Sequence, residues 1–148
     1  CCTIQQSNST KDGDTWGGSN YYTYGARTGR AFNADTRIIA KGGMGQSTGF
    51  YFHNLRQVWN KYYSADNAPV YPLTSWVPDV VVHAMGQNDQ FQYDPNTDWY
   101  GTLKTRYVDQ IRDYRRVYPN AHIICMNTTM TDPNFLNGVW QAVQALND

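Results

Sequence analysis

The segment Pro78–Asp89, with the sequence PDVVVHAMGQND, decides the fold class. Its apolar run Val80–Met85 has the composition of a β-strand that is covered on both faces. The run is followed by the segment Gly86–Asp89, which begins with a glycine and continues with polar residues. In open α/β sheets, ligands bind beyond the carboxyl ends of the strands. The segment therefore predicts a buried parallel strand with a candidate site directly after it.

The sequence on both sides of this strand alternates between strand and helix patterns. Short apolar runs predict two more strands, at Arg37–Ala40 and His122–Met126. Apolar residues at helical spacing predict helices at about 19–34, 48–63 and 136–146. They also predict a long helix with Leu103, Tyr107, Ile111 and Tyr114 on one face, which Tyr118–Asn120 closes. Strands that alternate with helices form βαβ units, so we expect an α/β protein with a parallel sheet. We find no internal repeat or linker, and we expect the polar residues 1–20 to form a loop.

Length and composition limit the possible functions. The 148 residues suit one domain, so we expect a single domain over residues 1–148. Twelve Lys and Arg residues balance twelve Asp and Glu residues, and only 16% of the chain is charged, below the usual ~25%. We therefore expect no nucleic-acid partner, and the lack of an apolar run of ~18–20 residues argues against a membrane span. The 12 Tyr, 5 Trp and 5 Phe residues favour neutral polyhydroxylated ligands such as carbohydrates.

The cysteines and the glycosylation motifs indicate where the protein works. Cys1, Cys2 and Cys125 form neither a disulfide scaffold nor a spaced metal site, so we expect no bound metal and a buried thiol at Cys125. The triplets that begin at Asn8 and Asn127 permit N-glycosylation in a secreted eukaryotic protein. The chain opens without a charged and apolar leader, so we expect a soluble, already processed protein outside the cell.

Glycine and amide residues follow the predicted strands. The strand ends read GGMG at Gly42–Gly45, GQND at Gly86–Asp89 and NTT at Asn127–Thr129. A glycine just after a strand lets a backbone N–H approach a ligand closely, and an asparagine amide beside it supplies a second donor. Two such donors that converge on one point form an oxyanion hole, and removal of one donor slows a reaction by ~100-fold to 1000-fold. The strand ends are therefore candidate positions for an oxyanion hole.

Three segments carry a family resemblance, which extends over nearly the whole chain. They are Tyr22–Gly45, Pro78–Phe91 and Tyr107–Met126, and the most specific element is the GQND sequence at Gly86–Asp89. Together they resemble the SGNH (GDSL-type) hydrolases, in which this element is the G-x-N-D block. More narrowly, they are similar to the acetyl-xylan esterases of carbohydrate esterase family two. The resemblance implies a three-layer α/β/α, flavodoxin-like fold and a serine esterase that needs no metal or cofactor.

The resemblance also implies roles for individual residues. By position, Asn88 and the backbone N–H of Gly45 would donate to the oxyanion, and Gly43 is the alternative register for the backbone donor. Asp89 would be a supporting residue that ties down the loop and takes no part in the chemistry. The catalytic contribution of this chain would therefore be electrostatic stabilisation.

Aromatic residues in the predicted loops have two interpretations. Trp16, Phe91 and Trp99 could stack on pyranose rings as substrate-binding residues, with Tyr93 as a weaker candidate. Alternatively, they cap the helices that they adjoin. We expect the remaining tryptophans to pack in the core or between helices, and these are Trp59, Trp76 and Trp140.

The chain departs from the family pattern at both catalytic blocks. The family has a G-D-S nucleophile block after its first strand and a D-x-x-H block near its C-terminus, and the 148 residues contain neither. The sequence GDT at Gly13–Thr15 resembles the first block, but it has Thr in place of Ser. We expect all three histidines, His53, His83 and His122, to be structural. The nucleophile and the base would then come from outside this sequence.

The missing blocks also carry the first and last strands of the family's sheet. In the family's strand order, the first strand lies between those expected at Arg37–Ala40 and Val80–Met85. Its absence leaves backbone groups unpaired, at ~1–3 kcal/mol each against a total stability of ~5–15 kcal/mol. We therefore predict that the chain does not fold alone. The missing strands would come from a companion polypeptide, a cleaved precursor or an untraced part of the chain.

The leading hypothesis is a secreted carbohydrate O-deacetylase, with an acetylated polysaccharide or oligosaccharide as substrate and this chain inert by itself. The alternative is a non-catalytic SGNH-like domain, either a glycan-binding module or a structural glycoprotein. A glycan on Asn127 would favour the alternative because it would crowd the pocket. A third hypothesis, a flavodoxin-like phosphate-binding module, rests on Gly42–Gly45 alone, without an accompanying G-x-G-x-x-G or Lys-Ser/Thr pattern.

Overall fold

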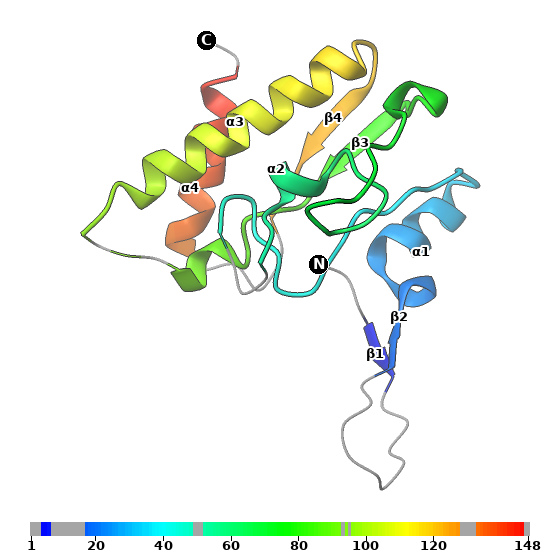
Figure 1. The fold of residues 1–148 in the computed structure, drawn as a ribbon, viewed down its shortest axis with the longest axis horizontal. Helices are drawn as coiled ribbons and strands as arrows, with labels where there is room; N and C mark the ends of the chain where they lie inside the picture. Colours follow the sequence, from blue (N-terminus) through cyan, green and yellow to red (C-terminus); the bar gives the residue numbers. More distant parts are fainter. Residues whose placement is uncertain are drawn as a thin grey trace, which may run out of the picture. The chain divides into compact units, whose positions relative to one another are not determined.

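The computed structural model describes residues 4–6, 17–48, 52–92, 94, 96–127 and 133–146 (Figure 1). The chain divides into two units, Cys1–Gly42 and Gly43–Asp148, and each is described by itself. The expectation of a single domain over residues 1–148 stays a prediction. Within the described ranges, the helices are too short or too polar to cross a membrane.

The first unit contains a short hairpin and one helix. β1 (Ile4–Gln6) pairs antiparallel with β2 (Gly17–Ser19), so the predicted loop was wrong at these two strands. A 3-10 turn, η1 (Asn20–Tyr22), leads into α1 (Tyr24–Ala31), which confirms the predicted helix over a shorter range. Thr23 begins α1, because its side-chain oxygen accepts a hydrogen bond from a backbone N–H of the first turn at 3.3 Å.

Residues 37–40 form no strand, so the strand predicted at Arg37–Ala40 was wrong. A strand needs a neighbour that pairs with its backbone N–H and C=O groups, and none of the described strands pairs with this segment. The segment instead folds back along α1. Ile38 lies against Gly25, and Thr36 lies so close to Gly29 that a Cβ atom at that position would overlap it.

The second unit is built on a parallel βαβ arrangement, as the sequence predicts (Figure 1). The long helix α3 (Trp99–Val117) connects β3 (Val80–His83) to β4 (His122–Cys125). The two strands pair in parallel, with Val80 opposite His122. Both predicted strands are confirmed, and each is shorter than predicted at its C-terminal end. Their carboxyl ends therefore lie at the same edge of the sheet.

Shorter helical segments complete the second unit. They are α2 (Leu55–Val58), η2 (Leu73–Ser75), η3 (Asp89–Gln92) and α4 (Pro133–Gln144). The helix predicted at 48–63 was wrong over most of its length, because α2 covers only its middle. The side chains of Asn54 and Gln57 form a capping box that begins the helix at this point. Beyond its end, Lys61 forms an antiparallel bridge with Val70.

The core of the second unit lies between α3, α4 and one face of the β3–β4 sheet. Its buried members are Leu103, Tyr107, Val108, Ile111, Val139 and Ala142. Ile123 and Cys125, which alternate along β4, pack against this cluster. A smaller cluster contains Met44, Leu55, Val58 and Trp59. Trp59 is thus buried as predicted, whereas Trp140 is 62% exposed on the solvent side of α4, so its predicted packing was wrong.

The other face of the β3–β4 sheet is half exposed. Val80 is 48% exposed, and Val82 and Ile124 are each 50% exposed. Side chains alternate between the two faces of a strand, so these residues point away from the face that α3 and α4 cover. The sequence predicts a strand covered on both faces, and the described residues cover one of them. The sheet is consistent with the expected SGNH-type fold with strands missing from this chain.

Candidate functional site

The buried carboxylate of Asp89 fixes a glycine loop, defined here as residues 44–48. Asp89 is 0% exposed at the start of η3. Its carboxylate accepts hydrogen bonds from the backbone N–H groups of Gln46, Ser47 and Thr48 at 2.6, 2.7 and 3.0 Å, and from the Ser47 hydroxyl at 2.8 Å. Hydrogen bonds to an ionised acceptor are stronger than neutral ones, and these offset the hydration that a buried carboxylate loses. The loop and Asp89 therefore stabilise each other.

Gly45 occupies a position where no side chain fits. A Cβ atom there would overlap the Thr48 carbonyl and the Asp89 carboxylate. The Gly45 carbonyl also accepts a hydrogen bond from the first backbone N–H of α2 at 3.0 Å. The neighbouring glycines differ, because Gly42 has open space around it and Gly43 has a φ of 78°, which suits a turn. Close packing thus restricts position 45 to glycine.

Asn88 contacts the peptide unit that carries the Gly45 N–H. Its Nδ2 donates a hydrogen bond to the Met44 carbonyl at 3.0 Å, and that carbonyl shares a rigid plane with the Gly45 N–H. An asparagine amide has two N–H donors, so this bond leaves capacity for a second. Gly86, with a φ of 113°, makes the turn that follows β3 and accepts a hydrogen bond from the Asp89 N–H at 3.0 Å. Asn88, Asp89 and Gly45 therefore form one cluster.

Three polar side chains that the sequence analysis did not single out hold the same loop. The Arg106 guanidinium on α3 donates to the Ser47 carbonyl at 2.7 Å, and the Asn54 Nδ2 donates to it at 3.2 Å. The fully buried Gln46 side chain donates to the Arg106 carbonyl at 2.9 Å. The N-x-x-Q capping signal at Asn54–Gln57 could have drawn attention to Asn54. Arg106 is 59 residues from Ser47, so no local pattern reveals their contact.

The buried groups behind β3 have a structural arrangement. His83 is 2% exposed, as its place in a buried strand predicts, and its ring centroid lies 4.6 Å from that of Tyr107 and 5.6 Å from that of Tyr114. Burial lowers the pKa of His83 from 6.5 to about 3 and raises the pKa of both tyrosines. Cys125 is half-buried, and burial raises the pKa of its thiol. All four groups are therefore neutral near pH 7.

Few of the predicted sugar-stacking side chains lie within the described part of the structure. Phe91 does, and it is 58% exposed on η3, two residues after Asp89. Trp16 lies outside the described residues, and so does the side chain of Trp99 at the start of α3. Gly13–Thr15 and the first glycosylation motif also lie outside them. A stacking rim formed by these aromatic residues stays a prediction.

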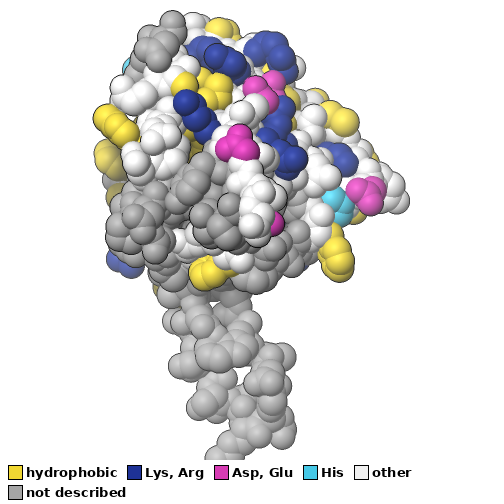
Figure 2. All heavy atoms as spheres, turned by 90° about the vertical axis from the view of Figure 1, so that its left-hand side faces the viewer, with side chains coloured by type: hydrophobic (Ala, Val, Ile, Leu, Met, Phe, Trp, Pro, Cys, Tyr) yellow, Lys and Arg dark blue, Asp and Glu magenta, His cyan; other side chains and the backbone are white. Residues whose placement is uncertain are grey.

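Charge on the second unit is of mixed sign. Asp113 of α3 contacts Arg116 at 2.7 Å and Arg56 of α2 at 3.0 Å. Figure 2 shows Lys and Arg side chains gathered on one face of the molecule with Asp side chains among them. In the ranges that the structure describes, no three His, Cys, Asp or Glu residues are grouped as metal ligands would be. The hydrogen bonds that hold the glycine loop come instead from amide, hydroxyl, guanidinium and carboxylate groups.

Comparisons with known proteins reveal relatives of one kind. No protein-family model matches the chain. The cellulase/esterase CelE of Acetivibrio thermocellus is 32% identical over 111 residues, which make up 72% of this chain and 13% of CelE. A carbohydrate esterase family 2 enzyme from Corynascus thermopiles (Myceliophthora fergusii) superposes with a TM-score of 0.72 and 27% identity over 87% of this chain and 45% of its own. A family two carbohydrate esterase from Clostridium thermocellum, in complex with cellohexaose, has a TM-score of 0.71 and 26% identity over 87% of this chain and 39% of its own.

These similarities define first a fold class and then a family within it. The chain has the α/β fold of the SGNH-type hydrolases, as the sequence predicts. More narrowly, it resembles the family two carbohydrate esterases over most of its own length. It spans less than half of the two solved enzymes, at 45% and 39% of their chains, and 13% of CelE. The resemblance therefore concerns a part of these proteins.

Proposed function

We propose that this chain forms the oxyanion-binding part of a carbohydrate O-deacetylase, a serine esterase of the SGNH type. The relatives described above are carbohydrate esterases. The observation that carries the proposal is the hydrogen bond from Asn88 to the Met44 carbonyl, because it holds the Asn88 amide, which has a second N–H to donate, next to the glycine loop. An acyl-transfer site needs two such donors near the carbonyl oxygen of its substrate.

In the proposed mechanism, a serine hydroxyl from outside this chain attacks the acetyl carbonyl carbon, and its proton passes to a histidine. The carbonyl oxygen becomes an oxyanion, and the Asn88 amide and the Gly45 N–H donate to it. The tetrahedral intermediate then breaks its bond to the sugar oxygen, which takes the proton from the histidine and leaves as a hydroxyl group. Water releases acetate from the acetyl-serine by the same steps. Asp89 holds the glycine loop in place throughout and transfers no proton.

We propose that the serine and the histidine lie on companion segments that also complete the sheet. Among the described strands, β3 and β4 pair only with each other, so each has an open edge. The half-exposed Val80, Val82 and Ile124 support this proposal, because apolar strands in parallel sheets are normally covered on both faces. A companion strand and helix would pair with the open edge and cover the apolar side chains.

We propose an acetylated polysaccharide or oligosaccharide as the substrate and a site of action outside the cell. The Clostridium thermocellum esterase in complex with cellohexaose supports a carbohydrate ligand. Phe91 is exposed close to Asp89, where its ring could cover the C–H groups of a sugar. Trp16 and Trp99 complete the proposed rim. Glycosylation at Asn8 and Asn127 remains part of this proposal for a secreted protein.

Hydrolysis of p-nitrophenyl acetate tests the proposal, with the chain alone and with the intact assembly, meaning the chain together with the segments that complete it. We expect no burst of p-nitrophenol from the chain alone and steady turnover by the assembly. Asn88→Ala in the assembly should lower kcat by ~100-fold to 1000-fold with little change in KM, since the amide acts on charge that develops in the transition state. Asn120→Ala, at an exposed turn before β4, serves as the matched control. A burst from the chain alone, or an unchanged kcat in Asn88→Ala, would overturn the proposal.

A non-catalytic glycan-binding module is the second candidate. It is favoured by the Clostridium thermocellum esterase in complex with cellohexaose, because this oligosaccharide carries no acetyl group to hydrolyse. Such a module would bind cellohexaose but would not hydrolyse p-nitrophenyl acetate in the complete assembly. The same assay therefore distinguishes the two candidates.

A further inference from the structure

The segment after α2 closes on itself and is called here the tyrosine loop, defined as residues 60–71. Its two ends are joined by a backbone hydrogen bond from the Tyr71 N–H to the Asn60 carbonyl at 2.7 Å. Next to this bond, Lys61 and Val70 form an antiparallel bridge. Compact surface loops whose ends lie close together are frequently functional. The tyrosine loop has this form.

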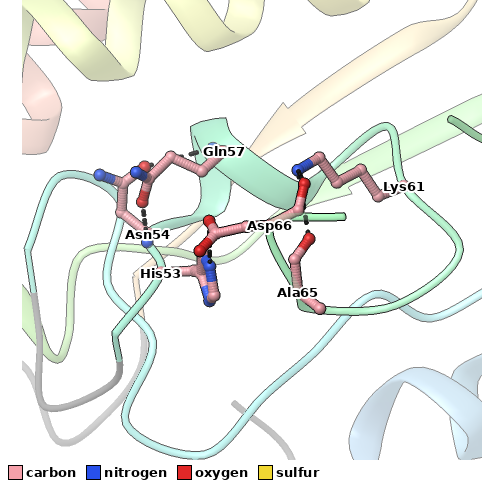
Figure 3. A network of polar contacts seen from close by, with 6 residues as sticks. All are labelled: His53, Asn54, Gln57, Lys61, Ala65 and Asp66. Carbon is pink, nitrogen blue, oxygen red and sulfur yellow. Dashed lines mark hydrogen bonds and ion pairs between the residues drawn. The ribbon is translucent and has the colours of Figure 1, made fainter. Parts of the chain in front are cut away.

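Charged side chains brace the tip of the tyrosine loop (Figure 3). The Lys61 ammonium donates to the carbonyls of Ala65 and Asp66 at 3.2 and 3.0 Å. The Asp66 carboxylate lies beside His53, with Oδ1 2.9 Å from Nε2. Lys61 therefore holds the tip from inside the loop, and His53 holds it from outside.

The His53 contact connects the tyrosine loop to the glycine loop. His53 directly precedes Asn54, whose side chain caps α2 and donates to the Ser47 carbonyl at 3.2 Å. Ser47 in turn donates to Asp89 from its N–H and its hydroxyl. A series of contacts thus runs from Asp66 to Asp89 and connects the tyrosine loop to the glycine loop.

Two tyrosines of the loop expose much of their surface. Tyr62 is 59% exposed and Tyr63 is 57% exposed. The rings of Tyr62 and Tyr71 meet edge to face, with centroids 5.2 Å apart and planes at 75°. This contact restricts the orientation of the Tyr62 ring before any ligand binds. A rigid ring gives a large amphipathic contact area at a low cost in conformational entropy.

We propose that the tyrosine loop is a carbohydrate-binding surface, on which Tyr62 and Tyr63 stack against the C–H faces of pyranose rings in a neutral polysaccharide. Exposed polar groups on the same loop, at Asp66 and Asn67, bond the sugar hydroxyls. Only the class of ligand rests on the proposed function, because the shape and rigidity of the loop come from its own contacts.

Isothermal titration calorimetry of the intact assembly with cellohexaose and with xylohexaose tests this proposal. Neither probe carries an acetyl group, so binding is measured without hydrolysis. Tyr62→Ala and Tyr63→Ala should each weaken the binding of at least one probe by about tenfold, or ~1.4 kcal/mol, and the double variant should weaken it further. Tyr62→Phe keeps the ring and should retain most of the affinity. Tyr21→Ala is the matched control, since Tyr21 is also 59% exposed but lies in the first unit.

Two results would overturn the proposal about the tyrosine loop. One is an equal affinity of the double variant and the unaltered assembly for both probes, with circular dichroism showing that both are folded. The other is an unaltered assembly that shows no saturable binding of either probe. Hydrolysis of p-nitrophenyl acetate separates this proposal from the proposed function, because that ester contains no sugar. If the tyrosine variants bind sugar more weakly but hydrolyse the ester unchanged, the result supports the proposal about the tyrosine loop. If sugar binds but no ester is hydrolysed, the result supports that proposal and refutes the proposed esterase function.

Discussion

The glycine loop and the tyrosine loop are both irregular segments of the second unit, but they are held in different ways. Asp89, Asn54 and Arg106 reach the glycine loop from three other parts of the sequence, and Arg106 is 59 residues away from its partner. The tyrosine loop is held mainly by its own bridge and by Lys61. A loop held from outside takes its shape from the whole fold, whereas a loop held from within keeps its shape when distant contacts change. Substitutions in the two loops should therefore have unequal effects.

Asp89→Ala should have the largest effect, because it removes the acceptor of all the hydrogen bonds that the carboxylate receives from residues 46–48. Buried donors without a hydrogen-bond partner destabilise the fold, so the free energy of unfolding should fall by ~3–5 kcal/mol. Urea denaturation measures this change. Asp89→Asn keeps part of the acceptor capacity, so its free energy of unfolding should lie between those of Asp89→Ala and the unaltered protein. A loss below ~1 kcal/mol would mean that the glycine loop does not depend on Asp89.

Gly45→Ala should have the next largest effect, because its methyl group overlaps the Thr48 carbonyl and the Asp89 carboxylate. Overpacking of this kind lowers the free energy of unfolding by ~1–3 kcal/mol. Gly42→Ala is the matched control, since no atom lies within 4 Å of the added methyl group. Thermal unfolding of both variants gives the comparison. Equal melting temperatures for the two variants would contradict the steric argument.

Arg106→Ala should have a smaller effect, because Asn54 also donates to the Ser47 carbonyl. We expect a loss of ~1–2 kcal/mol in the free energy of unfolding and faster hydrogen exchange at the Gln46 and Ser47 amides. Arg112→Ala, at an exposed position of the same helix, should change neither. If the exchange of these amides stays unchanged in Arg106→Ala, α3 does not help to hold the glycine loop.

Asp66→Ala should have the smallest effect on stability, because the Asp66 side chain is 96% exposed and its contact with His53 lies near the surface. Surface ion pairs contribute ~0–1 kcal/mol, and the internal bridge of the tyrosine loop remains. The same urea denaturation used for Asp89→Ala measures the change. A loss as large as that of Asp89→Ala would show that both loops are held from outside, and the comparison between them would fail.

Local patterns are enough to predict the two parallel strands and the long helix between them. The apolar run at Val80–His83 and the one at His122–Cys125 have the length and composition of buried parallel strands, and the structure confirms both. The positions of Asn88 and Asp89 follow from the same reasoning, because residues after a parallel strand gather at one edge of the sheet. The position of Gly45 does not, because the strand predicted before it, at Arg37–Ala40, was wrong. The chemical roles of all three residues stay predictions.

Contacts between distant segments account for what local patterns miss. Tyr62 has the helical spacing of Leu55, Val58 and Trp59, yet it lies in the tyrosine loop, because the backbone after α2 pairs with residues near Val70. The strand predicted at 37–40 fails for a related reason, since an apolar run becomes a strand only where another strand pairs with it. Spacing along the chain records neither kind of pairing.

The half-exposed side chains of Val80, Val82 and Ile124 have a consequence for the solubility of the chain. An open strand edge beside apolar side chains is a template on which another such edge can add. A sheet with this edge and this face left uncovered would therefore tend to aggregate. Any segment that pairs with the edge and covers the valine and isoleucine side chains would then protect the protein from aggregation as well as add to its fold.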